Sequence, residues 1–249
     1  MDLIKNHILI VFGLCCLFSC KNAIIPKSEG KEIQVIVFSK TLGFRHSSIE
    51  KGITSIQKLG RDNGFHVDTT ENSDTLISNI KNYDAVIFLS PSGDIFSNEQ
   101  QDAFKTYIQN GGGFVGIHAA TTAEYDWPWY GTMIGAYFDD HPKPQPATLN
   151  IVNHNHPASS FLENQWYTFD EWYNFKSLST SIQVLITIDE TSYTGGKHGE
   201  NHPIAWYHNF EGGRIFYTAL GHADASYSDP LFLKHILGGI AYATGTNAL

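Results

Sequence analysis

Residues 111–120 constrain the fold of this chain more than any other stretch. Gly111, Gly112 and Gly113 allow a sharp turn out of a preceding helix, and the apolar residues after them have the character of a short buried strand that ends at His118. In a sheet with helices on both faces, ligands bind outside the carboxyl ends of the strands. We therefore expect His118 at a functional site. The alternative is a histidine that is merely hydrogen-bonded at a strand end.

The spacing of Gly116, His118 and Ala120 is that of a nucleophile elbow, in which a tight strand-to-helix turn exposes one side chain. Here His118 takes the place of the nucleophile. An imidazole can act as an acid, a base or a metal ligand, but it does not carry out the stable acyl-enzyme chemistry of cysteine or serine.

Strand and helix patterns alternate before this stretch. Apolar runs of strand length occupy residues 33–38 and 85–89, and a further strand is expected over 65–70. Helices are expected from a capping box at Ser47 to a stop at Gly64, over 74–81 and over 97–110. This alternation predicts an α/β fold with a doubly wound, mostly parallel sheet, right-handed crossovers and helices on both faces.

After His118 the pattern changes. Residues 121–146 are rich in aromatic residues, proline and glycine, which predicts a long functional loop with short helical pieces. Further strands are expected over 147–153, 166–175, 184–189, 204–210 and 214–220, the last two as a hairpin, and a helix over 229–245. No repeat and no second domain boundary is visible. The sequence predicts one domain over residues 32–246.

The N-terminal segment has the pattern of a bacterial lipoprotein signal peptide over residues 1–20. Lys5 is followed by an apolar run, and a lipobox ends at Cys20; residues 21–31 are expected to form a flexible spacer. Lipidation of Cys20 would hold the protein at the bacterial cell envelope, with no other membrane contact. An uncleaved N-terminal anchor is the alternative. All three cysteines lie in this segment, so the mature domain has no cysteine for a disulfide or a metal.

The charge balance bears on the class of partner. With 16 basic and 25 acidic residues, the net charge is −9, and no basic run is present that would bind a nucleic-acid backbone. A small-molecule partner is favoured. Tryptophan and tyrosine are concentrated between residues 125 and 207, and such rings in a cleft often stack on sugars, although ordinary core packing is the alternative.

Three histidines follow predicted strand ends or begin the helix after one: His46, His118 and His222. Because strand ends of a parallel sheet share one edge, these imidazoles are the candidate metal ligands. Without cysteine, imidazole and carboxylate suit Zn²⁺, Mn²⁺ or Fe²⁺ in an open site. No compact ligand motif is present, and the alternative is that a charged His46 beside Arg45 holds an oxyanion without any metal.

Further candidates lie in the loops of the same predicted edge. Asp170 and Glu171 fall on a predicted strand, where neighbouring side chains point to opposite faces, so only one of them is expected to face the site. The catalytic candidates are His118, Glu124, Glu171 and Arg45, and the substrate-binding candidates are Asp126, Trp127, Trp129, Trp172, His141 and His202.

A resemblance to a known family covers nearly all of the mature chain. Its motifs are Gly43-Phe44-Arg45-His46, residues 111–120 and 124–131, His141-Pro142, residues 170–175 and 202–206, and Leu220-Gly221-His222. In this order they resemble the ThuA-like family, named for trehalose utilisation. The resemblance implies a flavodoxin-like fold of the class I glutamine amidotransferase-like superfamily. Amidotransferases carry cysteine where this chain has His118, so glutamine amidotransferase activity is not expected.

The resemblance also implies a sugar substrate, since family members accompany disaccharide dehydrogenases. We expect an exported enzyme that acts on a disaccharide or its 3-keto derivative by proton abstraction, with isomerisation, elimination or hydrolysis. The alternative is a non-catalytic carbohydrate-binding lipoprotein of the envelope. Titratable side chains that converge in one concave site would favour the enzyme, and a flat aromatic platform would favour the binding protein.

Overall fold

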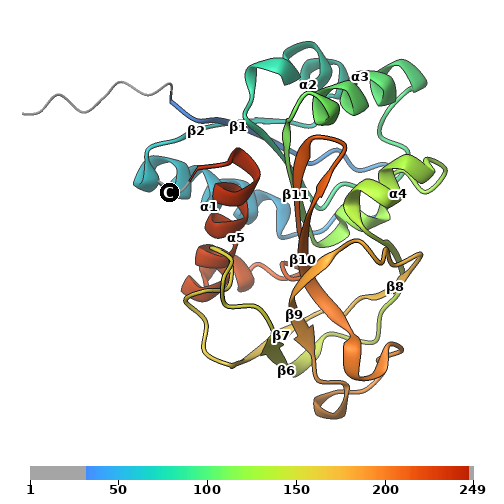
Figure 1. Ribbon diagram of the computed structural model, residues 1–249, viewed down its shortest axis with the longest axis vertical. Helices are drawn as coiled ribbons and strands as arrows, with labels where there is room; N and C mark the ends of the chain where they lie inside the picture. Colours follow the sequence, from blue (N-terminus) through green and yellow to red (C-terminus); the bar gives the residue numbers. More distant parts are fainter. Residues whose placement is uncertain (1–31, 247–249) are drawn as a thin grey trace, which may run out of the picture. The chain divides into compact units, whose positions relative to one another are not determined.

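The computed structural model describes residues 32–246, which form an α/β fold around a nine-stranded mixed sheet (Figure 1). Five parallel strands make up one half of the sheet, and four strands continue it in antiparallel pairing. In sheet order, they are β2 (His66–Thr70), β1 (Gln34–Phe38), β3 (Ala85–Leu89), β4 (Gly113–Ile117), β11 (Gly213–Thr218), β10 (Pro203–Phe210), β9 (Gln183–Ile188), β6 (Gln145–Ile151) and β7 (Gln165–Asp170).

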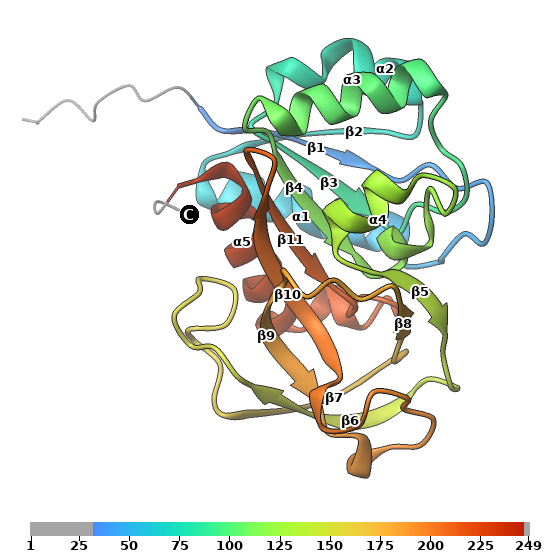
Figure 2. The same ribbon diagram turned by 45° about the vertical axis from the view of Figure 1, so that its right-hand side comes forward.

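Helices cover both faces of the parallel half, as predicted (Figure 2). On one face α1 (Ile49–Asn63) lies beside α5 (Pro230–Thr244), and on the other α2 (Ser73–Asn79) lies beside α3 (Asn98–Gln109), with α4 (Pro128–Ile134) next to them. Strand β3 is buried along its whole length, as a central parallel strand should be. Short 3₁₀ turns are η1 (Ile80–Asn82), η2 (His118–Thr122), η3 (Glu190–Ser192), η4 (Gly199–Asn201) and η5 (Ser226–Ser228).

The predicted capping box at the start of α1 is wrong. The N-cap residue is Ser48 rather than Ser47, and its side chain makes no cap hydrogen bond. The hydroxyl of Ser48 donates to the carbonyl oxygen of Gly221, that of Ser47 donates to Asp224, and Glu50 pairs with Arg45. The helix end is as expected, because Gly64 takes a left-handed conformation that glycine adopts without strain. A long-range contact has replaced the local cap, and it ties the start of α1 to the loop after β11.

The single strand predicted over residues 166–175 is also wrong. The strand is interrupted after β7, and the next strand, β8 (Asn174–Lys176), pairs with β5 (Tyr137–Asp140) in a separate two-stranded sheet. Strand β5 lies in the stretch that was expected to be a loop. The break falls at Glu171, whose backbone N–H bonds the side chain of Asp170 at 2.8 Å rather than a neighbouring strand.

None of the helices within residues 32–246 has the length and apolar character needed to cross a membrane. The predicted signal peptide, the spacer and Cys20 lie outside the described residues, so lipidation and the envelope location stay predictions.

Candidate active site

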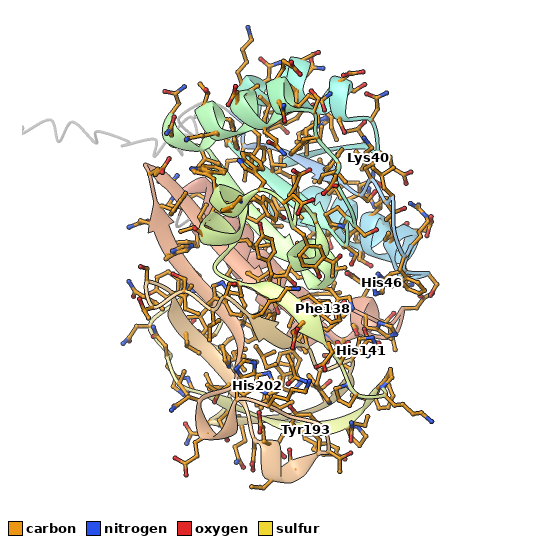
Figure 3. The ribbon with its side chains drawn as sticks, turned by 90° about the vertical axis from the view of Figure 1, so that its right-hand side faces the viewer. Lys40, His46, Phe138, His141, Tyr193 and His202 are labelled. Atoms are coloured by element: carbon orange, nitrogen blue, oxygen red, sulfur yellow. The ribbon has the colours of Figure 1, made fainter. Side chains whose placement is uncertain are left out.

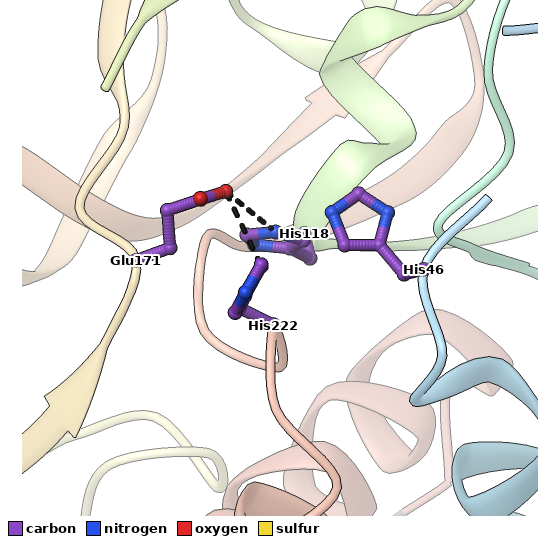
Figure 4. Close-up of side chains that lie close together, drawn as sticks. All are labelled: His46, His118, Glu171 and His222. Carbon is purple, nitrogen blue, oxygen red and sulfur yellow. Dashed lines mark ion pairs between the residues drawn. The ribbon is translucent and has the colours of Figure 1, made fainter. Parts of the chain in front are cut away.

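Four side chains from separate parts of the chain meet at the carboxyl edge of the parallel strands (Figure 4). His118 follows β4, His46 precedes α1, His222 follows β11, and Glu171 follows β7. Each offers one nitrogen or oxygen atom, and these atoms all lie within 4.8 Å of one another. The structure thus brings together the three histidines that the strand ends predicted, and it selects Glu171 as the carboxylate beside them.

The tautomer of His118 follows from its neighbours. Its Nδ1 lies 2.7 Å from the carbonyl oxygen of Ala219, which can only accept, so Nδ1 carries the proton. The lone pair is left on Nε2. This nitrogen is buried without a hydrogen-bond partner and lies 3.5 Å from Oε2 of Glu171. The backbone of His118 has φ of 50°, the sharp turn expected of an elbow.

His222 is held in place through its backbone. The carboxylate of Asp170 accepts hydrogen bonds from the N–H groups of Gly221 at 2.9 Å and of His222 at 3.0 Å. Gly221 has φ of 112°, and a Cβ atom there would lie 2.9 Å from the hydroxyl of Tyr227, so the turn requires glycine. This support brings Nδ1 of His222 to 3.3 Å from Oε2 of Glu171.

Burial and the neighbouring charges set the ionisation of the cluster. Burial, together with the imidazoles of His118 and His222, lowers the pKa of His46 to about 3, so this ring is neutral at physiological pH. Burial by itself would raise the pKa of Glu171, but the imidazoles of His118 and His222 outweigh it and hold that pKa below its ordinary value. The carboxylate is therefore ionised, and its interaction with His222 raises the pKa of that imidazole.

A pocket of about 510 Å³ opens onto this cluster. Aromatic and titratable side chains line it together, and Figure 3 labels three of them, His46, Phe138 and His141. The lining residues are Gly43, Phe44, His46, Ser92, Gly93, Thr122, Tyr125, Phe138, His141, Glu171, Tyr173 and His222.

His141 is the predicted substrate contact that does lie in the pocket. Its Nδ1 lies 2.9 Å from the carbonyl oxygen of Pro142 and 3.1 Å from Oε1 of Glu171. Because a carbonyl oxygen only accepts, Nδ1 carries the proton and Nε2 has the lone pair. Oε1 of Glu171 therefore lies next to His141, and its Oε2 lies next to His118 and His222.

The other two predicted catalytic residues do not line the pocket. The guanidinium of Arg45 pairs with Glu50 and Glu71, each at 2.7 Å, on the exposed surface. The carboxylate of Glu124 is buried and accepts hydrogen bonds from Phe96 N at 2.8 Å and Gln101 Nε2 at 2.6 Å, at the start of α3. Both charges are satisfied by partners outside the pocket, which corrects their assignment.

Five predicted substrate contacts also lie elsewhere, which corrects their assignment too. Asp126 is exposed outside the pocket lining. Trp127 stacks on Trp129 with ring centroids 4.9 Å apart, and both rings pack against α3. Trp172 is buried and donates to the carbonyl oxygen of Gln145, and buried His202 donates to that of Tyr173. The tryptophan rings pack inside the fold and not in the pocket, because burial of their large apolar area stabilises the protein.

The sequence did not single out the aromatic residues that do line the pocket, which are Phe44, Tyr125, Phe138 and Tyr173. Phe44 and Tyr173 stand within motifs of the resemblance, next to His46 and Glu171. Phe138 lies on β5, within the predicted loop. The local signal there is limited to Tyr137 and Phe138, two aromatic residues that favour strands, followed by two aspartates that do not.

Comparisons with known proteins agree with this architecture. A family model described as trehalose utilisation, ThuA, matches residues 34–243. No match was found among curated proteins. A ThuA-like protein of Bacteroides uniformis has a TM-score of 0.73 at 24% identity, covering 88% of this chain and 94% of its own. A ThuA-like protein of Parabacteroides merdae has a TM-score of 0.73 at 23% identity, covering 87% and 91%.

A more distant likeness is to a β-galactosidase of Bacillus circulans sp. alkalophilus, with a TM-score of 0.56 at 12% identity, covering 87% of this chain and 32% of that one. At such identities these structures share the fold.

Proposed function

Because this chain belongs to the ThuA family of trehalose utilisation, we propose that it is a carbohydrate-processing enzyme acting on a disaccharide or its 3-keto derivative. One observation carries the proposal: an aromatic-walled pocket of about 510 Å³ ends on a buried cluster of imidazoles and an ionised carboxylate. That volume lies within the range of small-molecule sites. The rings of Phe44 and Phe138, which line the pocket, can stack on the apolar face of a sugar.

A ketone at C3 of a sugar acidifies the proton on C2, and His141 is the base that the geometry supports. Its Nε2 has the lone pair, and Glu171 stands beside Nδ1 to stabilise the imidazolium that forms. Transfer of the C2 proton to Nε2 leaves an enolate, whose negative charge requires stabilisation in the pocket.

Three outcomes follow from such an enolate. In the first, the hydroxyl proton on C2 moves to the C3 oxygen and His141 returns its proton to C3, which leaves the carbonyl group at C2 and isomerises the sugar. Alternatively, the electrons form a C1–C2 double bond while the bond from C1 to the glycosidic oxygen breaks, and the leaving oxygen takes the proton back from His141. Addition of water to that product completes a hydrolysis.

The rival function is a non-catalytic carbohydrate-binding protein. Its expected feature was a flat aromatic platform built from the tryptophan-rich stretch. Trp127 and Trp129 instead stack on each other beside α3, outside the pocket lining. Converging titratable side chains in a concave site favour the enzyme.

The test is incubation of the purified protein in D₂O with trehalose, sucrose and their 3-keto derivatives, followed by NMR of the sugars. We expect deuterium at C2 of a 3-keto sugar, then product. His141→Gln should slow the exchange by about 100-fold or more. His66→Gln, at an exposed position of β2, should not change the rate. Binding of sugars without exchange or product in the wild type would support the carbohydrate-binding protein instead.

A further inference from the structure

Two buried imidazole nitrogens that face Glu171 have no hydrogen-bond partner: Nε2 of His118 and Nδ1 of His222. A buried polar atom left unsatisfied costs about 1–3 kcal/mol. Two such atoms facing one carboxylate are unusual, and His46 joins them: one nitrogen of each histidine and one oxygen of Glu171 all lie within 4.8 Å of one another (Figure 4). We propose that His46, His118, His222 and Glu171 bind one divalent transition-metal ion.

The spacing of the candidate ligand atoms fits such an ion. Four ligands at about 2.1 Å from a tetrahedral centre stand about 3.4 Å from one another. Oε2 of Glu171 lies 3.5 Å from Nε2 of His118 and 3.3 Å from Nδ1 of His222. The separations in the set reach at most 4.8 Å, so the most distant pair must close by about 1.4 Å, which side-chain rotation supplies.

The orientations of the three rings agree with a common centre. The ring of His46 stands at 87° to that of His118 and at 88° to that of His222, and the latter two stand at 66° to each other. Three rings inclined in this way can each present an edge to one ion without stacking on one another.

The surroundings of the ligands are those that metal sites use. A metal-bound histidine usually donates its other N–H to a carbonyl or carboxylate, which fixes the tautomer. Nδ1 of His118 donates to Ala219 O at 2.7 Å and so directs Nε2 into the cluster. Asp170 holds the backbone N–H groups on which the position of His222 depends.

The donor set selects the class of ion. Three imidazoles and one carboxylate suit Zn²⁺, Mn²⁺ or Fe²⁺, whereas Mg²⁺ and Ca²⁺ prefer oxygen ligands. The pocket opens onto His46, Glu171 and His222, so a substrate oxygen can reach the same place. The role of the ion rests on the proposed function: at this floor it would supply the positive charge that an enolate requires.

The experiment measures metal binding without turnover. The full chain is purified without chelator, its metal content is determined, and the apoprotein is reloaded with Zn²⁺, Mn²⁺, Fe²⁺ or Co²⁺, the last read by its visible absorption. We expect one ion per chain. His118→Ala and His222→Ala should each weaken binding by about 100-fold or more, while His141→Gln, next to the cluster but outside the ligand set, should keep the ion.

His222 is half-buried on a loop, so His222→Ala tests the site even if His118→Ala does not fold. A wild-type protein that binds none of the four ions, or a His222→Ala variant that binds as the wild type does, would overturn the proposal. The two proposals fail separately. Stoichiometric metal without activity on sugars would overturn the enzyme alone, and turnover by a protein that binds no metal would overturn the metal site alone.

Discussion

Asp170 bonds the backbone of His222 across the sheet edge, with its Oδ1 accepting from the His222 N–H at 3.0 Å. The two residues are 52 positions apart in the sequence. The next residue, Glu171, meets the side chain of the same histidine at 3.3 Å. The two adjacent acidic residues therefore have different roles. Asp170 fixes the backbone of the loop after β11, and Glu171 contributes its carboxylate to the cluster.

Asp170→Asn should destabilise the protein by about 2 kcal/mol, because one of two buried N–H groups loses an anionic acceptor. Displacement of His222 should also lower activity. Urea unfolding followed by fluorescence measures the first effect. Asp224→Asn, at an exposed position of the same loop, is the matched control and should unfold as the wild type does. Equal stability of the two variants would contradict the role given to Asp170.

Phe44→Ala tests the rim of the pocket. The Phe44 side chain is 70% exposed and lies edge-on to His46, so its removal should change the free energy of unfolding by no more than about 0.5 kcal/mol. If a sugar packs on it, KM for the substrate should rise several-fold with little change in kcat. Tyr167→Ala, equally exposed on β7 and outside the pocket, serves as the control. An unchanged KM for Phe44→Ala would remove this residue from the substrate site.

Stability should fall between pH 6.5 and pH 4 because of two buried histidines, His235 on α5 and His156 packed against that helix. Burial lowers the pKa of His235 to about 4, and burial with the nearby His235 charge lowers that of His156 to about 4. In this window the unfolded chain binds protons that the folded chain does not. Each histidine therefore costs about 1.4 kcal/mol of stability per pH unit as the pH falls.

His235→Gln removes one of these titrations, and the amide can still donate to the carbonyl oxygen of Ala158. Urea unfolding at several pH values should show a slope shallower by about one proton, or about 1.4 kcal/mol per pH unit. The exposed His66→Gln should leave the slope as it is. If the free energy of unfolding of His235→Gln changed with pH as steeply as that of the wild type, folding would not lower the pKa of His235.

Cys20→Ser tests the predicted lipid anchor. If residues 1–20 form a lipoprotein signal peptide, the substitution should abolish labelling with a radioactive fatty acid and release the protein from the membrane fraction. Labelling of the wild type is the positive control. Membrane association that persists in the variant would instead support an uncleaved apolar anchor.

The sequence by itself determined the alternation of strands and helices up to His118 and the approach of His46, His118 and His222. Apolar periodicity is a local property, and β3 was predicted with the same bounds that the structure shows. Since parallel strands end at a shared edge of the sheet, the position of a residue directly after such a strand is enough to place it at that edge. The motifs of the resemblance also indicated the family.

Only the tertiary structure decided which other side chains join those histidines. Glu124 and Arg45 carry the right charges, but Phe96, Gln101, Glu50 and Glu71 satisfy them outside the pocket. The break in the strand at Glu171 depends on bonds from Asp170 to residues more than 50 positions away. Side-chain direction is set by such long-range partners and by packing, and no local pattern encodes them.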